Sequence, residues 1–332
     1  MAKKISKARR GGKKRSRKPG VWPGQIFKLL VSISVLVVIV LGAAFLAQVL
    51  LDRPKEQTKP VQIAKPQAPP AFEVFPPVKP QVPKPPAPPV QLPEGHLPLV
   101  AIIIDDIGYD RPLAQKFMNL GVPFTLSFLP HAPFSRTILA QAQANGFEAM
   151  LHLPMEPNEY PGVNPGPGAL LSSMTPDELI AQLEENISRL DGIKGVNNHM
   201  GSRLSASSEQ MRQIFSILKK QGLYYVDSRT GAQTAAPPSA RLLQLPFAER
   251  DIFIDHLDDP EFIRSQMRKL AQRARKQGYA IGIAHPHQTT YDLFEELMPE
   301  FQQQVQLVPA SMLVKQAMFV QAARAALAGD ER

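Results

Sequence analysis

An apolar run that ends in two adjacent acids is the feature that most constrains this sequence. The run Leu99-Val-Ala-Ile-Ile-Ile104 is followed by Asp105 and Asp106, and a turn glycine, Gly108, comes shortly after. Six apolar residues in a row are typical of a strand buried on both faces, as in parallel sheets. Two neighbouring carboxylates cannot both stay ionised when buried unless a cation or donors hold them. The run therefore predicts a buried strand with a functional site at its carboxyl end, where α/β proteins place their chemistry. A helix N-cap beside a solvated acid is the simpler alternative.

Strand and helix patterns alternate through the rest of the chain up to residue 308. The expected strands are 100–104, 124–129, 148–153, 195–199, 223–227, 252–255, 279–284 and 305–308. The expected helices are 111–119, 134–145, 175–190, 207–222, 259–278 and 290–301. Alternation over about 220 residues favours one α/β domain of the β/α-barrel type. The sequence contains no glycine-rich dinucleotide motif, no P-loop and no Gly-x-Ser-x-Gly, so nucleotide-binding and serine-hydrolase functions lack their usual motifs.

Positive charge is concentrated at the N-terminus. The 332 residues carry a net charge of +9, and residues 1–28 contain eleven Lys and Arg and no acid, which leaves −2 for the remainder. Because no basic stripe is interleaved with aromatic residues, we expect no nucleic-acid binding by the main domain. Residues 29–51 are apolar apart from Ser32, Ser34 and Gln48, which is about the length of 20 residues that a membrane-spanning helix needs. The basic tail predicts that the N-terminus is cytoplasmic and that the rest of the chain lies outside.

The segments after the basic tail suggest a tethered domain. We expect residues 29–51 to be an uncleaved anchor; a cleaved signal peptide is the alternative, but the apolar segment is long for one. Residues 52–98 are rich in proline and indicate a polyproline-type spacer, with a ligand for an SH3-like domain as a weaker reading. The main domain is then expected at 99–310, followed by a C-terminal helix or tail at 311–332.

Histidines gather at the ends of the predicted strands. Six of the seven lie there, namely His131, His152, His199, His256, His285 and His287, and only His96 falls in the spacer. A single histidine at a strand end is usually a hydrogen-bonded structural residue, but six on one rim are harder to explain in that way. The chain has no cysteine, so any metal would be bound by His, Asp or Glu, ligands that suit zinc, manganese or similar ions. The pattern indicates a metal site with an open position for water.

These residues resemble the motifs of the divergent polysaccharide deacetylase family, a distant branch of the NodB-type carbohydrate esterases. The segment Ile103-Ile-Asp-Asp-Ile-Gly108 is similar to the family's Thr-Phe-Asp-Asp-Gly, in which the first Asp is the general base and the second binds metal. The segment Gly146-Phe-Glu-Ala-Met-Leu-His152 is similar to Gly-His-Glu-Ile-Gly-Asn-His, whose last His binds metal. The resemblance covers residues 99–309 and implies a deformed (β/α)7 barrel. It implies that Asp105 is the base and that Asp106 and His152 are metal ligands.

Other positions depart from the family pattern or leave a choice. Glu156 stands where the family has a second metal-binding histidine, so Glu156 is a candidate ligand, and His199 in Asn197-Asn-His-Met-Gly-Ser-Arg203 is another. Ile283-Ala-His-Pro-His287 is similar to the last motif, which leaves His285 or His287 as the general acid. Asp227 stands where the family has an Asp that orients catalytic residues. Three further residues beside predicted strand ends are candidate substrate contacts: His131, Arg203 and Arg229.

The resemblance implies metal-dependent N-deacetylation of a polysaccharide. The expected cofactor is a divalent metal, with zinc as first choice. Combined with the predicted anchor, it places the domain in the periplasm, tethered to a bacterial inner membrane through one helix and acting on an envelope polymer such as peptidoglycan. The alternative is a catalytically degenerate barrel that binds glycan or docks a protein, which the loss of one ligand histidine at position 156 favours.

Overall fold

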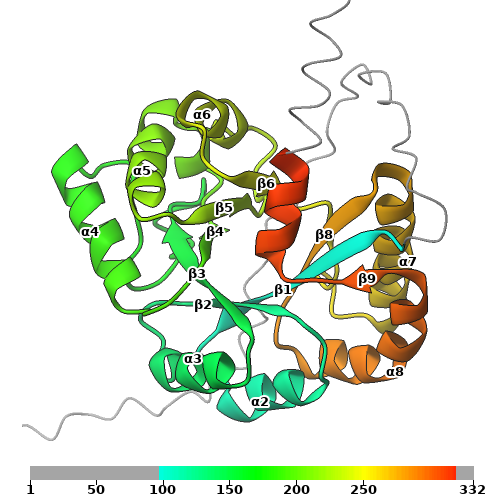
Figure 1. The fold of residues 1–332 in the computed structure, drawn as a ribbon. Coiled ribbons are helices and arrows are strands. Elements are labelled where there is room, and N and C mark those ends of the chain that lie inside the picture. The colour runs from blue at the N-terminus through cyan, green and yellow to red at the C-terminus, as the bar shows by residue number, and fades with distance from the viewer. Residues whose placement is uncertain (1–96, 319–332) are drawn as a thin grey trace, which may run out of the picture. The chain divides into compact units, whose positions relative to one another are not determined.

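The structure is a computed structural model that describes residues 97–318. Within this range, nine parallel strands form one curled sheet surrounded by helices (Figure 1). The strands are β1 (Leu99–Ile107), β2 (Thr125–Phe128), β3 (Glu148–Met155), β4 (Gly195–Met200), β5 (Tyr224–Asp227), β6 (Phe247–Glu249), β7 (Ile252–Phe253), β8 (Tyr279–Ala284) and β9 (Gln306–Leu307). The helices are α2 (Arg111–Asn119), α3 (Ser135–Ala144), α4 (Pro176–Ser188), α5 (Ser208–Lys220), α6 (Ala236–Leu243), α7 (Pro260–Gln277) and α8 (Gln288–Gln304), with a 3-10 turn at Leu204–Ala206 and a helix from residue 310 onward.

The sheet is open, and the chain itself bridges its two edges. The strand order is β6-β5-β4-β3-β2-β1-β8-β7, with β9 beside the start of β1. Strands β6 and β7 are at opposite edges, yet only Arg250 and Asp251 separate them in the chain. The predicted α/β class and parallel sheet are confirmed. The expected deformed barrel is found as a curled sheet that stays open, since β6 and β7 do not pair with each other in the described range.

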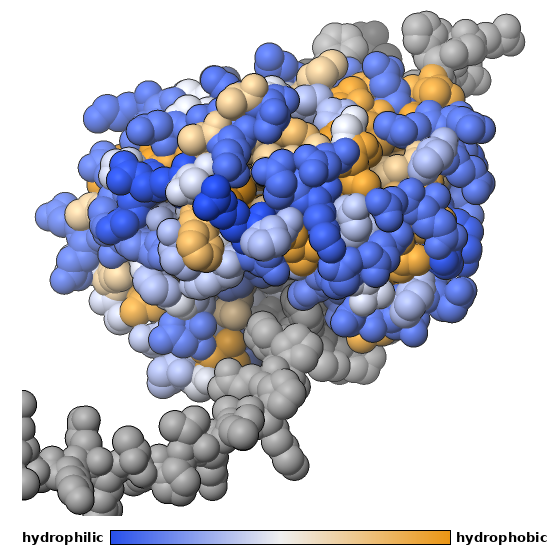
Figure 2. Space-filling model, turned by 90° about the horizontal axis from the view of Figure 1, so that it is seen from below, coloured by the Kyte–Doolittle hydropathy of each residue, from blue (hydrophilic) through white to orange (hydrophobic). Residues whose placement is uncertain are grey.

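Helix boundaries follow the local signals in the sequence. Thr175 and Glu178 form a capping box at the start of α4, and Ser207 and Asp259 cap α5 and α7. The apolar side of each amphipathic helix packs on the outer face of the sheet, against alternate strand residues such as Ile102 and Ile104. On the face seen in Figure 2, which includes the side where α2, α3 and α8 lie in Figure 1, hydrophilic residues predominate, as expected for the outer surfaces of such helices.

The inner side of the curled sheet holds a second apolar cluster, and the C-terminal helix belongs to it. Ala101, Ile103 and Ile283 point inward from the strands and pack with Leu313 and Val314 of the helix 310–318. Both helix residues are buried. The domain therefore extends beyond the predicted boundary at residue 310, because this helix covers apolar surface that the open sheet would otherwise expose.

Polar contacts fix the first turn of this helix. The amide of Ser311 donates to the Glu148 carboxylate at 3.0 Å, and the amide of Ala310 donates to the Thr125 hydroxyl at 2.9 Å. The Tyr224 hydroxyl also donates to Glu148, at 2.8 Å. These residues begin β2, β3 and β5, so the contacts lie at the end of the sheet opposite Asp105 and Asp106.

Several expectations need correction or fall outside the described range. No element was expected between residues 228 and 251, where the structure has α6 and β6. Strand β7 is shorter than the predicted 252–255. Among residues 97–318, no helix has the length and apolarity to span a bilayer. The predicted tail 1–28, span 29–51 and nearly all of the spacer 52–98 lie outside the described residues.

Candidate active site

Strand periodicity places the polar residues above the inner apolar cluster. Side chains alternate between the two faces of a strand, so residues two positions after inward-facing Ile103, Met150 and Ile283 also face inward. These residues are Asp105 on β1, His152 on β3 and His285 just after β8. All three are buried. The carboxyl ends of these parallel strands therefore bring the three side chains together.

Asp106 reaches the same site because β1 is irregular at this point. The register between β1 and β2 shifts between Ile104 and Ile107, and Asp106 has a φ of 55°. Regular alternation would turn Asp106 away from Asp105, but a bulge with a left-handed residue re-aims the side chain. A non-glycine residue in this region is strained, and such strain is concentrated at functional sites. The bulge explains how two consecutive carboxylates serve one site.

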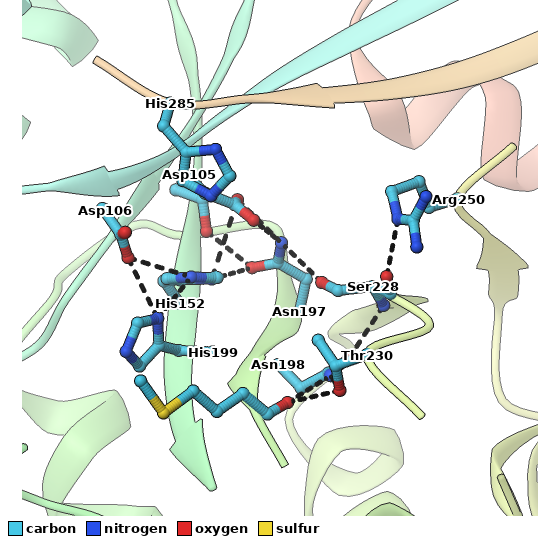
Figure 3. A network of polar contacts seen from close by, with 12 residues as sticks. Asp105, Asp106, His152, Asn197, Asn198, His199, Ser228, Thr230, Arg250 and His285 are labelled. Carbon is cyan, nitrogen blue, oxygen red and sulfur yellow. Dashed lines mark hydrogen bonds and ion pairs between the residues drawn. The ribbon is translucent and has the colours of Figure 1, made fainter. Parts of the chain in front are cut away.

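Asp106, His152 and His199 form a compact triangle of potential ligand atoms (Figure 3). Asp106 Oδ1 lies 3.2 Å from His152 Nε2 and 3.0 Å from His199 Nδ1, and the two nitrogens are 3.1 Å apart. Four ligands at about 2.0–2.1 Å from a tetrahedral zinc ion would be about 3.3–3.4 Å from one another. The three atoms are therefore spaced nearly as metal ligands are.

The chemistry of the triangle fits a cation. Asp106 Oδ1 is buried and, among the residues described, accepts no hydrogen bond of good geometry despite its short distances to both rings. An unsatisfied buried carboxylate oxygen is costly. Burial raises the pKa of Asp106, but the charges of the neighbouring histidines outweigh burial and hold the pKa well below its usual range. The carboxylate is thus ionised, which is the state that a metal ligand requires.

Asp105 occupies a different environment beside this triangle. Asn197 donates to both of its carboxylate oxygens, at 2.8 and 3.1 Å, and His152 Nδ1 lies 3.6 Å from Oδ1. Burial raises the pKa of Asp105 and exceeds the opposing effects of His152, His285 and Asn197. A carboxylate with a raised pKa is a stronger proton acceptor. The adjacent acids therefore differ in chemistry, as the sequence resemblance implies.

His285 is oriented by Asp255, a residue to which the sequence analysis gave no role. His285 Nδ1 is 2.9 Å from Asp255 Oδ1, and Asp255 Oδ2 accepts the amide of His285 at 2.6 Å and the Thr290 hydroxyl at 2.8 Å. Burial lowers the pKa of His285, but Asp255 and the more distant Asp106 and Asp105 outweigh it and raise the pKa to about 9. Figure 3 shows the His285 ring next to Asp105. His287 is only half-buried and precedes α8, although a ring nitrogen of His287 lies within 4.8 Å of ligand atoms of Asp255 and His285.

Glu156 lies away from the triangle. Its Oε1 accepts from Arg203 Nη1 at 2.9 Å, and its Oε2 accepts the amide of Ser172. Arg203 also donates to the carbonyl of Asn158. Glu156 and Arg203 thus hold together the loops after β3 and β4, and the structure places His199, not Glu156, at the third corner.

Three further predicted site residues are engaged elsewhere. Asp227 lies two residues after Tyr225 on the same strand, so it points to the outer face of the sheet as Tyr225 does. Its carboxylate accepts hydrogen bonds from the amide of Arg229 and the hydroxyl of Thr234. It therefore shapes the turn after β5 and does not orient His285. The guanidinium of Arg229 pairs with Glu249 at 2.8 Å. His131 Nε2 lies 2.9 Å from Asn186 Oδ1 on α4.

Arg250 is a half-buried cation near the site that sequence reasoning missed. Its Nε and Nη2 donate to the carbonyls of Ser228 and Arg229, at 2.6 and 3.0 Å, and the guanidinium lies over the ring of Phe253. Burial lowers the pKa of Arg250 to about 10, against the effect of Asp227, so Arg250 stays charged at neutral pH. Arg250 lies in the two-residue link between β6 and β7, and its approach to the site depends on the order of the strands, which no local motif reveals.

Several known proteins are similar to this chain in sequence or in fold. The chain is 28% identical over 217 residues to the uncharacterized protein YibQ of Escherichia coli K12, a match that covers 65% of this chain and 67% of YibQ. It is 29% identical over 209 residues to an uncharacterized protein of Haemophilus influenzae, covering 63% of this chain and 74% of that one. The crystal structure of the uncharacterized protein ATU2773 from Agrobacterium tumefaciens C58 has the same fold, with a TM-score of 0.63 at 24% identity, over 68% of this chain and 92% of that chain.

Fold and site together define an α/β protein in which Asp and His side chains, spaced as potential metal ligands, meet at the carboxyl ends of a curled parallel sheet. Residues 102–314 match the model of the divergent polysaccharide deacetylase family. The chain belongs to this family, as the resemblance in its motifs implies, and the match includes every residue of the triangle and extends into the helix that begins at residue 310.

Proposed function

We propose that this protein is a metal-dependent N-deacetylase of an envelope polysaccharide. The observation that carries the proposal is the triangle of Asp106, His152 and His199, whose carboxylate oxygen is buried without a donor beside Asp105. These three residues would hold a divalent cation, with zinc the first choice for this His and Asp set. When bound, the ion would polarise the acetyl carbonyl and lower the pKa of a water.

The remaining residues supply proton transfer. Asp105, with its raised pKa, accepts a proton as the water oxygen bonds to the acetyl carbon. His285, protonated at neutral pH and held by Asp255, gives a proton to the nitrogen as the C–N bond breaks. The products are acetate and the free amine of the sugar. His285 is a better donor than His287 because only its ring is both buried and fixed by a carboxylate.

The substrate and location follow from the predicted anchor and spacer. A single helix at 29–51 would hold the chain in a bacterial inner membrane, and the spacer would carry the domain into the periplasm. The strand β1 starts at Leu99, just after the predicted spacer, and the site lies at the opposite, carboxyl end of the sheet. Peptidoglycan is then the polymer within reach.

Acetate release tests the proposal. The purified full-length chain, loaded with zinc, manganese or nickel, should release acetate from peptidoglycan or N-acetylated chitooligosaccharides. Asp105→Asn should bind metal but lose release, while Asp177→Asn, an exposed acid at the start of α4, should match the parent chain. Glycan binding without acetate release from the metal-loaded parent would support the alternative, a binding module that has lost its activity.

A further inference from the structure

Asn197 is a fully buried residue at the centre of the site whose role the proposed reaction leaves unassigned. It lies on β4, and its relative exposure is 0%. Dashed lines in Figure 3 join its side chain to both Asp105 and His152. It therefore contacts both the proposed proton acceptor and a proposed metal ligand.

The carboxamide of Asn197 uses all of its hydrogen-bonding capacity. Oδ1 accepts from the Ser127 hydroxyl at 2.6 Å and lies 2.8 Å from His152 Nδ1. Nδ2 donates to Asp105, and also to the Ser228 hydroxyl at 3.2 Å. An amide offers two donors and two acceptor positions, so each has a partner.

This network allows only one orientation of the amide. An ionised carboxylate can only accept hydrogen bonds, so the NH₂ group of Asn197 must face Asp105 and its oxygen must face His152. That oxygen in turn requires a proton on His152 Nδ1. In a neutral imidazole the other nitrogen, Nε2, then carries a lone pair, and Nε2 is the atom directed at Asp106 and His199.

We infer that Asn197 is a positioning residue that couples the base to the metal site. It holds Asp105 by donating to its carboxylate, and it selects the His152 tautomer that can bind a cation. The hydroxyls of Ser127 and Ser228 keep the amide in place from β2 and from the end of β5. The inference rests on the proposed function, because it assigns Asp105 and His152 the roles proposed above.

Tautomer and metal affinity can be measured without any activity. In the metal-free full-length chain labelled with ¹⁵N only in histidine, long-range ¹H–¹⁵N spectra should show His152 protonated at Nδ1. Asn197→Leu should abolish this preference. It should also weaken zinc binding by about 10–100-fold, as loss of a residue that hydrogen-bonds to a metal ligand does. Competition with a chelator measures the affinity. Asn198→Leu is the matched control, since Asn198 is equally buried but bonds to Ser228, Thr230 and Met200; it should leave the His152 tautomer unchanged.

Asn197→Asp separates the effect of Asn197 on the His152 tautomer from its effect on Asp105. It keeps an acceptor for His152, so the tautomer and zinc affinity should persist within about threefold, well short of the loss expected for Asn197→Leu. It replaces the donor to Asp105 with an anion, so acetate release should fall more than about tenfold, or about 1.4 kcal/mol in transition-state stabilisation. This variant also decides the matter if Asn197→Leu does not fold. His152 protonated at Nε2 in the parent, or unchanged acetate release in Asn197→Asp, would overturn the inference. A parent chain with the expected tautomer and affinity but no acetate release would refute the proposed function and leave the coupling to the metal ligand intact.

Discussion

The placement of Glu156 and His199 yields the sharpest test of the ligand set. Glu156 occupies the position of a family metal ligand, yet its carboxylate pairs with Arg203 and the amide of Ser172. Glu156→Gln should therefore leave metal affinity unchanged. It should cost stability instead: a charge-assisted hydrogen bond contributes about 1.5–3 kcal/mol, and because the Arg203 side chain is 46% exposed, solvent screening reduces the loss to about 1–2 kcal/mol. His199→Ala removes a corner of the triangle and should weaken zinc binding by more than about 100-fold, beyond what loss of an outer partner costs.

Two assays on the same purified variants separate these effects. Competition with a chelator measures the zinc affinity, and urea unfolding without metal measures the free energy of unfolding. The expected pattern is a stability loss with full affinity for Glu156→Gln and an affinity loss for His199→Ala. If Glu156→Gln loses as much zinc affinity as His199→Ala, Glu156 is a metal ligand and the assignment of His199 in its place is wrong.

Three further outcomes follow from burial and charge. Leu313→Ala should destabilise the chain by about 3 kcal/mol, because it leaves a cavity in the inner cluster, whereas Met312→Ala, at a side chain that is 50% exposed, should cost less than about 1 kcal/mol; equal effects in urea unfolding would contradict the packing of this helix. Asp255→Asn should lower the pKa of His285 and move the alkaline limb of the pH–rate profile to lower pH; an unmoved limb would exclude His285 as the donor. Because the pKa of His285 is raised from 6.5 to about 9 in the folded chain, its protonation stabilises the fold fully below pH 6.5 and this contribution is lost as pH rises through about 9; unfolding measured across that range should show a weaker pH dependence in Asp255→Asn.

Much of the site could be predicted because strand periodicity is written in the sequence. Ile103 and Asp105, Met150 and His152, and Ile283 and His285 are each two residues apart and share a face. The same rule would have excluded Asp227 from the site, because Asp227 is two residues from Tyr225, which points to the outer face of the sheet. The assignment of Asp227 came from the family pattern and not from the alternation around it.

Other features depend on long-range geometry that local patterns do not contain. The bulge that turns Asp106 toward the site depends on pairing with β2. Asn197 and Asp255 act through hydrogen bonds to residues 92 and 30 positions away. The expected deformed barrel takes the form of an open, curled sheet, and its opening could not be predicted because β6 and β7 are very short and the link between them joins opposite edges.

The central claim is that Asp106, His152 and His199 bind one divalent cation. Anomalous X-ray diffraction from crystals of the zinc-loaded chain, recorded on both sides of the zinc absorption edge, tests it most directly. We expect one strong peak about 2.0–2.2 Å from Asp106 Oδ1, His152 Nε2 and His199 Nδ1, with Asp105 free to act as base. No peak at the triangle, or a peak ligated by Glu156, would contradict it.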